Sequence, residues 1–235
     1  KRKTYRGKLE RVRDLPVFLN RDYNHKTVQS GTTAINYYYS NDGEPAQVLA
    51  AAKEALEYFE STIGEYPWKQ LNIVQNDMYL SGMEYSTMIL ISNKAIKNNP
   101  RQTVFHEVGH QWFYNIVGSY QYNAPFMDEG LVEFISTSAL TDRKYEYRSN
   151  LTGLNHSLES FNTWDQYRSI HYHQGQRWFE SLYSLMGQEK FSSFIRDYYQ
   201  EYKYRLVTPG EFNTFALNYI DNRSAQELFG YLQTE

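Results

Sequence analysis

Apolar residues in the first part of the chain follow the pattern of β-strands. Residues 15–19 (LPVFL) form a short apolar run, and residues 32–39 are rich in β-branched and aromatic side chains. Residues 71–74 and 88–91 are two further short segments of the same kind. Runs of this type, bounded by turn-forming residues, are typical of strands. We therefore expect strands within the first forty residues, including one at 15–19, and two more strands after them.

Two segments with helical spacing of apolar residues predict helices around these strands. Residues 46–63 place Val, Leu, Ala and Phe on one helix face and are followed by Gly64, a residue that commonly follows a helix end. Asn99 and Pro100 have the residue types of an N-cap and a first helical position. The second helix is therefore predicted over residues 100–117, ending at the glycine that follows.

The rest of the chain has an almost wholly helical pattern. A third helix is predicted over residues 126–140, starting at either of its first two residues. From Gly175 onward the helical spacing of apolar residues continues, with breaks at Gly187 and at the Pro-Gly pair of residues 209–210. Strands therefore come first and helices follow, which predicts an α+β fold.

Composition narrows the possible classes of function. The chain has 235 residues, enough for a sizeable core, and 24 Lys and Arg against 27 Asp and Glu give a net charge of −3. This charge disfavours a nucleic-acid partner, and no apolar run approaches the roughly 18 residues that span a bilayer. There is no cysteine, so any metal must be bound by His, Asp or Glu. The 23 tyrosines favour half-buried aromatic surfaces.

A metal-binding motif lies within the second predicted helix. His106, Glu107 and His110 form the pattern HExxH. Residues four apart lie on one helix face, so both imidazoles can reach a single ion. Glu107 would then lie beside the ion, where its carboxylate can take a proton from metal-bound water. The alternative interpretation is a pair of partly buried histidines on an amphipathic helix.

Glu129 offers a third ligand at the start of the next predicted helix, with eighteen residues between it and His110. Two His, one Glu and an open water position form a catalytic zinc set. A negative residue is also favoured in the first turn of any helix, and Asp128 fits that role equally well. Glu133, four residues on, either accepts a hydrogen bond from the far nitrogen of a ligand histidine or is a solvated charge.

Four motifs in a fixed order make the chain resemble the zinc aminopeptidases of the aminopeptidase N family. Residues 110–112 (HQW) extend HExxH to the family's HExxHxW, and Glu129 has the family's spacing. Residues 82–85 (GMEY) match a G-x-M-E-N or G-M-E-Y motif before the zinc helix, and residues 172–175 (YHQG) stand for a Y-E-K-G motif. Residues 12–15 (VRDL) resemble the strand that closes the family's N-terminal β domain. The order is more specific than any single motif.

The resemblance implies one zinc ion and a role for each residue around it. The implied zinc ligands are His106, His110 and Glu129. Glu107 would be general base toward the zinc water, whose pKa falls toward about 7, and then acid toward the leaving amine. Tyr172 would donate a hydrogen bond to the oxyanion of the tetrahedral intermediate.

The resemblance also implies a substrate, a peptide with a free N-terminal amine. Glu84 would pair with the α-ammonium group, which explains why such enzymes remove one residue from the N-terminus rather than cut internally. Gly82 and Met83 would present backbone groups to the peptide as a strand edge does. The implied activity is hydrolysis of the N-terminal peptide bond.

Several positions depart from the family's pattern. His173 and Gln174 replace Glu and Lys, Asp128 replaces Asn, and the 43-residue interval from the third ligand to Tyr172 is shorter than expected. The alternative for Tyr172 is a half-buried tyrosine at a helix start. For His171 and His173 the alternatives are polar contacts to substrate or surface histidines.

For the fold, the resemblance implies a thermolysin-like arrangement with zinc between a sheet lobe and a helical lobe. Residues 1–20 would be a remnant of an N-terminal β domain, residues 21–190 the zinc peptidase domain, and residues 191–235 a helical C-terminal part. The chain then looks like an excised catalytic domain or a much reduced family member. Two alternatives stay open: a zinc endopeptidase on the same scaffold, and a binding module that keeps the fold without turnover.

Overall fold

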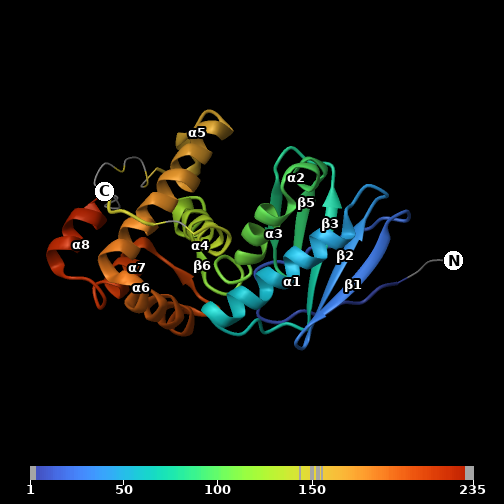
Figure 1. The fold of residues 1–235 in the computed structure, drawn as a ribbon, viewed down its shortest axis with the longest axis horizontal. Coiled ribbons are helices and arrows are strands. Elements are labelled where there is room, and N and C mark those ends of the chain that lie inside the picture. Colours follow the sequence, from blue (N-terminus) through green and yellow to red (C-terminus); the bar gives the residue numbers. More distant parts are fainter. Residues whose placement is uncertain (1–3, 143, 149–150, 152–153, 155, 231–235) are drawn as a thin grey trace.

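The computed structural model describes residues 4–142, 144–148, 151, 154 and 156–230. A lobe built on a β-sheet lies on one side and a lobe of helices on the other, with α3 (Pro100–Gly109) and α4 (Glu129–Leu140) between them (Figure 1). The described residues therefore form the α+β fold that the order of strands and helices predicted.

The sheet has five strands in the order β1-β2-β3-β5-β4. β1 (Asn24–Ser30) and β2 (Thr33–Tyr39) form an antiparallel hairpin, and β3 (Gln70–Asn76) lies parallel to β2. β5 (Met88–Ser92) runs parallel to β3, and β4 (Gly82–Tyr85) pairs antiparallel with β5. The strand that contains Glu84 is therefore an edge strand of the sheet.

The core of the sheet lobe follows from the alternation of side chains along its strands. Alternate residues of β2 are buried, among them Ile35 and Tyr37, as expected for a strand with one face against a core. α1 (Pro45–Thr62) lies along this sheet and buries Leu56 and Phe59. The predicted helix over residues 46–63 is confirmed within one residue.

The helix that contains HExxH is shorter than predicted. α2 (Asn93–Asn98) precedes it, and α3 ends at Gly109 rather than at residue 117. Beyond it the main chain folds back on itself, because Asn115 N–H donates to the His110 carbonyl at 3.0 Å and Tyr114 N–H donates to the Val117 carbonyl at 3.0 Å. These tight-turn hydrogen bonds override the helical spacing of apolar residues.

The helical lobe consists mainly of the C-terminal helices. In chain order these are α5 (Trp164–Arg168), the π-helical turn η3 (Ser169–Gln174), α6 (Gly175–Tyr202), α7 (Pro209–Ala216) and α8 (Asn222–Phe229). Aromatic rings fill the interior between them, with Trp178 and Phe212 among the fully buried side chains. Both predicted breaks are confirmed: Gly187 kinks α6 with a φ of 73°, and a proline starts α7.

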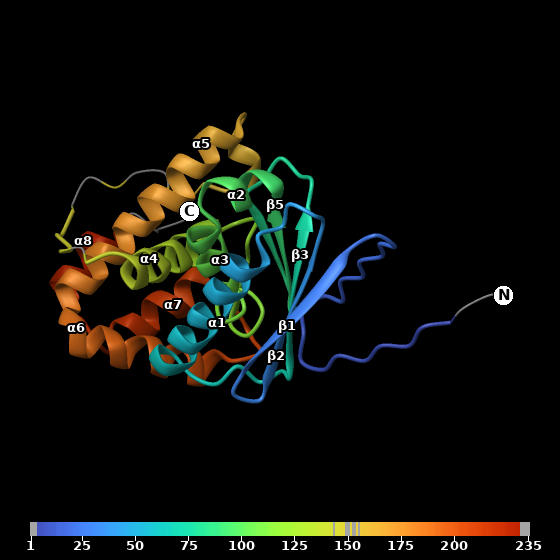
Figure 2. The same ribbon diagram turned by 45° about the vertical axis from the view of Figure 1, so that its right-hand side comes forward.

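Residues 15–19 do not form the predicted strand. The segment is extended but pairs with no strand in the described part of the chain, and its side chains are exposed, 76% for Val17 and 82% for Leu19. Pro16 also lacks the N–H donor that a paired strand needs. In Figure 2 the N-terminal segment runs away from the body of the molecule. Without a partner strand, an apolar run forms no hydrogen bonds that would stabilise it as a strand.

The N-terminal segment is nevertheless held to the body, notably at Arg13 and Asp14. The Arg13 guanidinium donates to the main-chain carbonyls of Tyr114 and Arg205, and Asp14 Oδ1 accepts from Ser86 N–H at 2.9 Å. These contacts join the segment to both lobes. None of the described helices combines the length and the apolar content needed to cross a bilayer. The division at residues 20 and 190 stays a prediction, and its ends at 1–3 and 231–235 lie outside the described residues.

Candidate metal centre and active site

The two histidines of HExxH lie at the buried end of α3. Asn99 caps this helix, since its side chain accepts from Gln102 N–H, and Pro100 occupies the first turn. His106 and His110 are both buried, as is Glu129 at the start of α4. Two neighbouring helices therefore direct three potential ligands into one buried region, as their spacing in the sequence predicted.

Three side-chain atoms converge at this point with the spacing of metal ligands. His106 Nε2 lies 3.0 Å from His110 Nε2 and 3.2 Å from Glu129 Oε2, and His110 Nε2 lies 3.3 Å from the same oxygen. Ligands at the usual zinc distances of about 2.0–2.1 Å in a tetrahedron are about 3.3 Å apart. The three atoms thus form one face of a tetrahedron of the size that zinc requires.

The hydrogen bonds made by the two Nδ1 atoms determine which ring nitrogens can bind a metal. His106 Nδ1 lies 2.9 Å from Glu133 Oε2, and His110 Nδ1 lies 3.1 Å from the Phe113 carbonyl. Both partners only accept hydrogen bonds, so each Nδ1 carries the hydrogen and each neutral ring turns its Nε2 lone pair to the centre. The lone pairs of the two Nε2 atoms and of the Glu129 oxygen then point toward one another. A divalent cation between them would stabilise this arrangement. The donor set therefore fits zinc.

The charges around the two histidines favour a bound cation. Burial opposes a positive charge on His106, but its hydrogen bonds to Glu129 and Glu133 outweigh this and raise its pKa. For His110, burial is likewise outweighed by Glu129 and Glu84, and its pKa rises to about 9. The negative surroundings that favour protonated imidazoles favour a bound metal ion equally.

Glu107 lies beside this donor set with one oxygen unused. The side chain is buried, and its Oε2 accepts no hydrogen bond from the described residues. Burial, which the nearby Glu84 reinforces, raises its pKa to about 8. The main chain of β4 packs directly on this carboxylate, because a Cβ atom at Gly82 would collide with Glu107 Oε1. Only glycine allows the strand to approach so closely.

Glu84 faces the same region from β4. It is 7% exposed, and its carboxylate lies within 4.8 Å of ligand atoms of Glu107 and His110. Burial raises its pKa, and the charge of Glu129 adds to this effect. Gln121, in the loop after β6 (Gly118–Ser119), donates its side-chain N–H to Glu84 Oε1 at 3.2 Å. The sequence analysis missed Gln121.

A buried amide connects β4 to the metal-binding helix. Gln111 Nε2 donates to the Tyr85 carbonyl at 3.0 Å, and Gln111 Oε1 accepts from Thr87 N–H at 2.9 Å. Both ends of this side chain are thus used to hold the turn between β4 and β5. Its place directly after HExxH is the sequence signal that could have identified it, because the position next to a metal ligand lies against whatever forms the site wall.

Tyr172 lies on the opposite side of the donor set, in η3. Its ring stacks on His106 with centroids 5.5 Å apart and planes 13° apart. Burial and Glu129 raise its pKa well above the usual value, so the hydroxyl keeps its proton and can donate. Single π-helical turns of this kind often occur at functional sites.

The two histidines beside Tyr172 differ in environment. His171 is fully buried against Phe161 and Tyr167, and among the described residues neither of its ring nitrogens has a hydrogen-bond partner. Burial lowers its pKa to about 4. It is neither a surface histidine nor a residue of the cavity, whereas His173 is exposed and lines the cavity. Residues two apart on a helix do not share a face, so His171 and His173 have different surroundings.

The helices that carry Glu129 and Tyr172 touch backbone to backbone at a pair of glycines. A Cβ atom at Gly130 would lie 2.7 Å from Gly175 Cα, and one at Gly175 would lie 2.9 Å from Gly130 Cα. No side chain at Gly130 can move aside from a main-chain atom. This contact therefore sets the distance between the third ligand and the tyrosine.

We expect Gly130→Ala to lower the free energy of unfolding by about 1–3 kcal/mol, as overpacking of a core usually does, and to weaken zinc binding. Thermal unfolding with and without zinc, together with zinc content, would measure both effects. Gly210→Ala is the control, since the nearest atom to a Cβ there is 4.0 Å away. Equal stability of the two variants would contradict the close contact.

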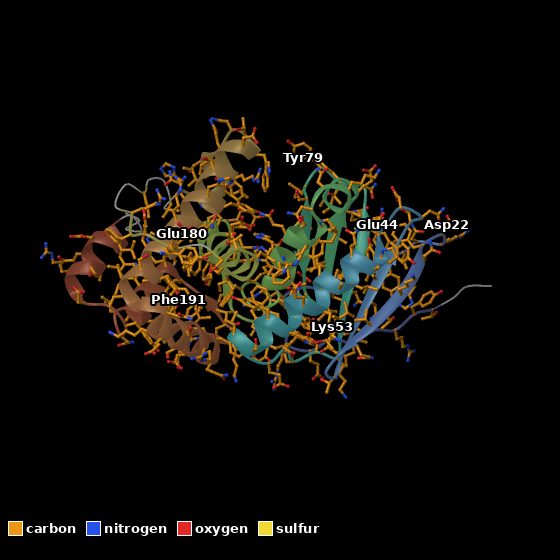
Figure 3. The ribbon with its side chains drawn as sticks, in the orientation of Figure 1. Asp22, Glu44, Lys53, Tyr79, Glu180 and Phe191 are labelled. Carbon is orange, nitrogen blue, oxygen red and sulfur yellow. The ribbon has the colours of Figure 1, made fainter. Side chains whose placement is uncertain are left out.

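One cavity of about 760 Å³ lies between the lobes, and its lining includes Glu84, His106, Glu107, Gln121, Glu129, Glu133, Tyr172 and His173. Its walls include Gly82 and Met83 of β4 and Trp164 of α5. Tyr79, in the loop before β4, stands at its rim near the top of Figure 3. The volume is in the range of small-molecule and peptide sites, and the cavity joins a candidate metal centre to a sheet edge.

Comparison with known proteins finds a family model that matches the part of the chain with the metal-binding motif. The model of the Peptidase family M1 domain matches residues 48–159, which contain GMEY, HExxH and Glu129. This part of the chain resembles an M1 peptidase domain. The resemblance to the aminopeptidase N family that the motifs indicated is thereby confirmed, and Tyr172 lies beyond the part of the M1 domain that this match covers.

Two curated relatives are aminopeptidases by name. Leucine aminopeptidase 2 of Aspergillus fumigatus is 23% identical over 202 residues, covering 76% of this chain and 33% of the relative. Human aminopeptidase B is 24% identical over 212 residues, covering 75% and 33%. The chain thus spans about a third of the length of these relatives.

Solved structures share the fold of this chain. An M1 zinc metallopeptidase from Deinococcus radiodurans matches with a TM-score of 0.67 at 17% identity, covering 90% of this chain and 52% of that one. A mutant form of that enzyme bound to a Tyr-Ser-Ala substrate matches with a TM-score of 0.65 at 14% identity and the same coverage. At this identity the likeness establishes the fold alone.

Proposed function

We propose that this chain is a zinc-dependent aminopeptidase that hydrolyses the N-terminal bond of peptides with a free amine. The observation that carries the proposal is that three groups of side chains meet at one cavity. A His-His-Glu donor set with tetrahedral spacing lies beside the unpartnered carboxylate of Glu107, and a second buried carboxylate, Glu84, faces both from an edge strand. The names of the curated relatives agree with this function.

His106, His110 and Glu129 would hold one zinc ion. When bound, zinc polarises the scissile carbonyl and lowers the pKa of a water molecule to about 7. Glu133 supports this arrangement because its hydrogen bond to His106 Nδ1 fixes the tautomer and orientation of that ring. The chain in this proposal has a thermolysin-like arrangement, with the metal between the sheet lobe and the helical lobe.

The proton transfers would be made by Glu107. Its free Oε2 takes a proton from the attacking water and later gives it to the leaving amine. The raised pKa of this carboxyl suits a group that must both accept and donate near neutral pH. Tyr172 keeps its phenolic proton and donates a hydrogen bond to the developing oxyanion, which stabilises that negative charge.

Recognition of the substrate would rest on Glu84 and on β4. The Glu84 carboxylate, held in a cavity that excludes most water, pairs with the α-ammonium group and so sets the scissile bond one residue away. The backbone of Gly82 and Met83 can bond to an extended peptide, because β4 is an edge strand whose outer side pairs with no strand of the described residues. A neutral N-terminus would leave Glu84 buried without a counter-charge.

The test compares a free-amine peptide with its N-acetylated form under matched zinc. We expect kcat/KM for the free-amine peptide to exceed that for the acetylated peptide by at least about 10²-fold, since losing a partner for a buried charge typically takes about 3 kcal/mol or more. Equal cleavage of both would indicate the endopeptidase. Stoichiometric zinc with no turnover of any free-amine peptide would indicate the binding module.

A further inference from the structure

Gln121 occupies a place beside Glu84 that no motif assigns. It belongs to the loop between β6 and η1 (Pro125–Met127), 37 residues further along the chain than Glu84. Its Nε2 donates to Glu84 Oε1 at 3.2 Å, and both residues line the cavity. The hydrogen bond therefore connects a loop of the helical side to the edge strand of the sheet.

Glu84 lies among charged groups of both signs, with His110 favouring its negative charge and other carboxylates opposing it. Within the described residues, Gln121 is the only side chain that donates a hydrogen bond to it. The carboxylates of Glu107 and Glu129 are close enough to oppose its charge. The Gln121 amide holds one Glu84 oxygen, and no side chain of the described residues donates to the other.

The amide of Gln121 has a second polar end. In the described part of the chain its Oε1 accepts no hydrogen bond, although the residue borders the cavity. An ammonium group has three N–H donors and seeks several acceptors. A neutral carbonyl oxygen beside a carboxylate is a suitable second acceptor, because it accepts without adding another charge to an already negative region.

We propose that Gln121 is a second amine-recognition residue, which orients the Glu84 carboxylate through its N–H and accepts from the substrate ammonium through its carbonyl oxygen. The inference rests on the proposed function, since it concerns the same amine. It adds that the amine is recognised by two segments of this chain, one from each side of the cavity. A purely structural role for Gln121, as a tether of its loop, is the competing explanation.

The two roles separate in a comparison of two ligands on two proteins. The ligands are leucine hydroxamate and its des-amino counterpart, which share the metal-binding group and differ only in the amine. Their dissociation constants are measured by calorimetry on the zinc-loaded protein for the unchanged chain and for Gln121→Leu. Asn123→Leu is the matched control, because Asn123 is exposed in the same loop and does not line the cavity.

We expect the unchanged chain and Asn123→Leu to bind the amine-bearing ligand at least about 30-fold more tightly than the des-amino ligand. In Gln121→Leu this ratio should fall about 10-fold, or about 1.4 kcal/mol, while the des-amino ligand binds as before. An unchanged ratio, or an equal loss for both ligands, would overturn the role of Gln121. If the unchanged chain itself does not distinguish the ligands, the proposed recognition of the amine fails first, and this inference fails with it.

Discussion

Replacing Glu107 with glutamine should reduce kcat by about 10³-fold or more while one equivalent of zinc stays bound. The carboxamide has the shape of the carboxylate and fits against Gly82, but it cannot take a proton from water or return one to the leaving amine. General acid–base catalysis contributes about 10²–10⁴-fold, and here one group makes both transfers. Initial rates on an aminoacyl-anilide, with zinc content measured on the same sample, would test this.

The control for this variant is Asp165→Asn. Asp165 also lines the cavity, but it is exposed and lies on α5, away from the donor set. We expect its activity to stay within about twofold of the unchanged chain, because an exposed charge contributes little. If Glu107→Gln kept more than a tenth of the activity with zinc bound, Glu107 would not be the base.

The second large effect is expected for Tyr172→Phe, which should lower kcat about 10²-fold with KM changed less than threefold. The ring keeps its stacking on His106, so the fold and the metal site stay intact. Only the hydroxyl is lost, and its interaction with the oxyanion exists in the transition state rather than in the bound substrate. Removing one donor of this type usually lowers kcat by about 10²–10³-fold.

Tyr167→Phe provides the comparison for Tyr172→Phe. Tyr167 lines the same cavity and stacks on Trp164, and none of the hydrogen bonds of the described residues involves its hydroxyl as a donor. Steady-state kinetics of both variants on one substrate would separate the two hydroxyl groups. Losses of similar size, or a loss for Tyr172→Phe confined to KM, would remove Tyr172 from the proposed mechanism.

The parts of the fold that depend on residues close to one another in the sequence were predictable from it. The helix over residues 46–63 and the breaks at Gly187 and residues 209–210 are encoded by spacing, glycine and proline. The convergence of His106, His110 and Glu129 was also predictable, because two residues four apart on a helix share a face and the third has a fixed spacing after them.

The errors occur where distant contacts decide the structure. The end of α3 is set by tight-turn hydrogen bonds and by Arg13, about a hundred residues earlier in the chain. Residues 15–19 have the composition of a strand but no partner strand in the described residues. Gln121 acquires its contact only when its loop folds back on β4, so no local pattern indicates it. His171 is buried because η3 turns it away from the cavity.

The position of β4 also bears on how the protein behaves in a crowded cell. An open sheet edge is ordinarily a surface on which other proteins pair and aggregate. Here the edge strand spans only Gly82–Tyr85, and its first three residues line the wall of the cavity rather than an open outer surface. A single flexible chain end can reach such an edge, whereas a folded sheet is too broad to enter. The shape of the cavity alone would thus exclude folded proteins and admit unstructured peptide ends.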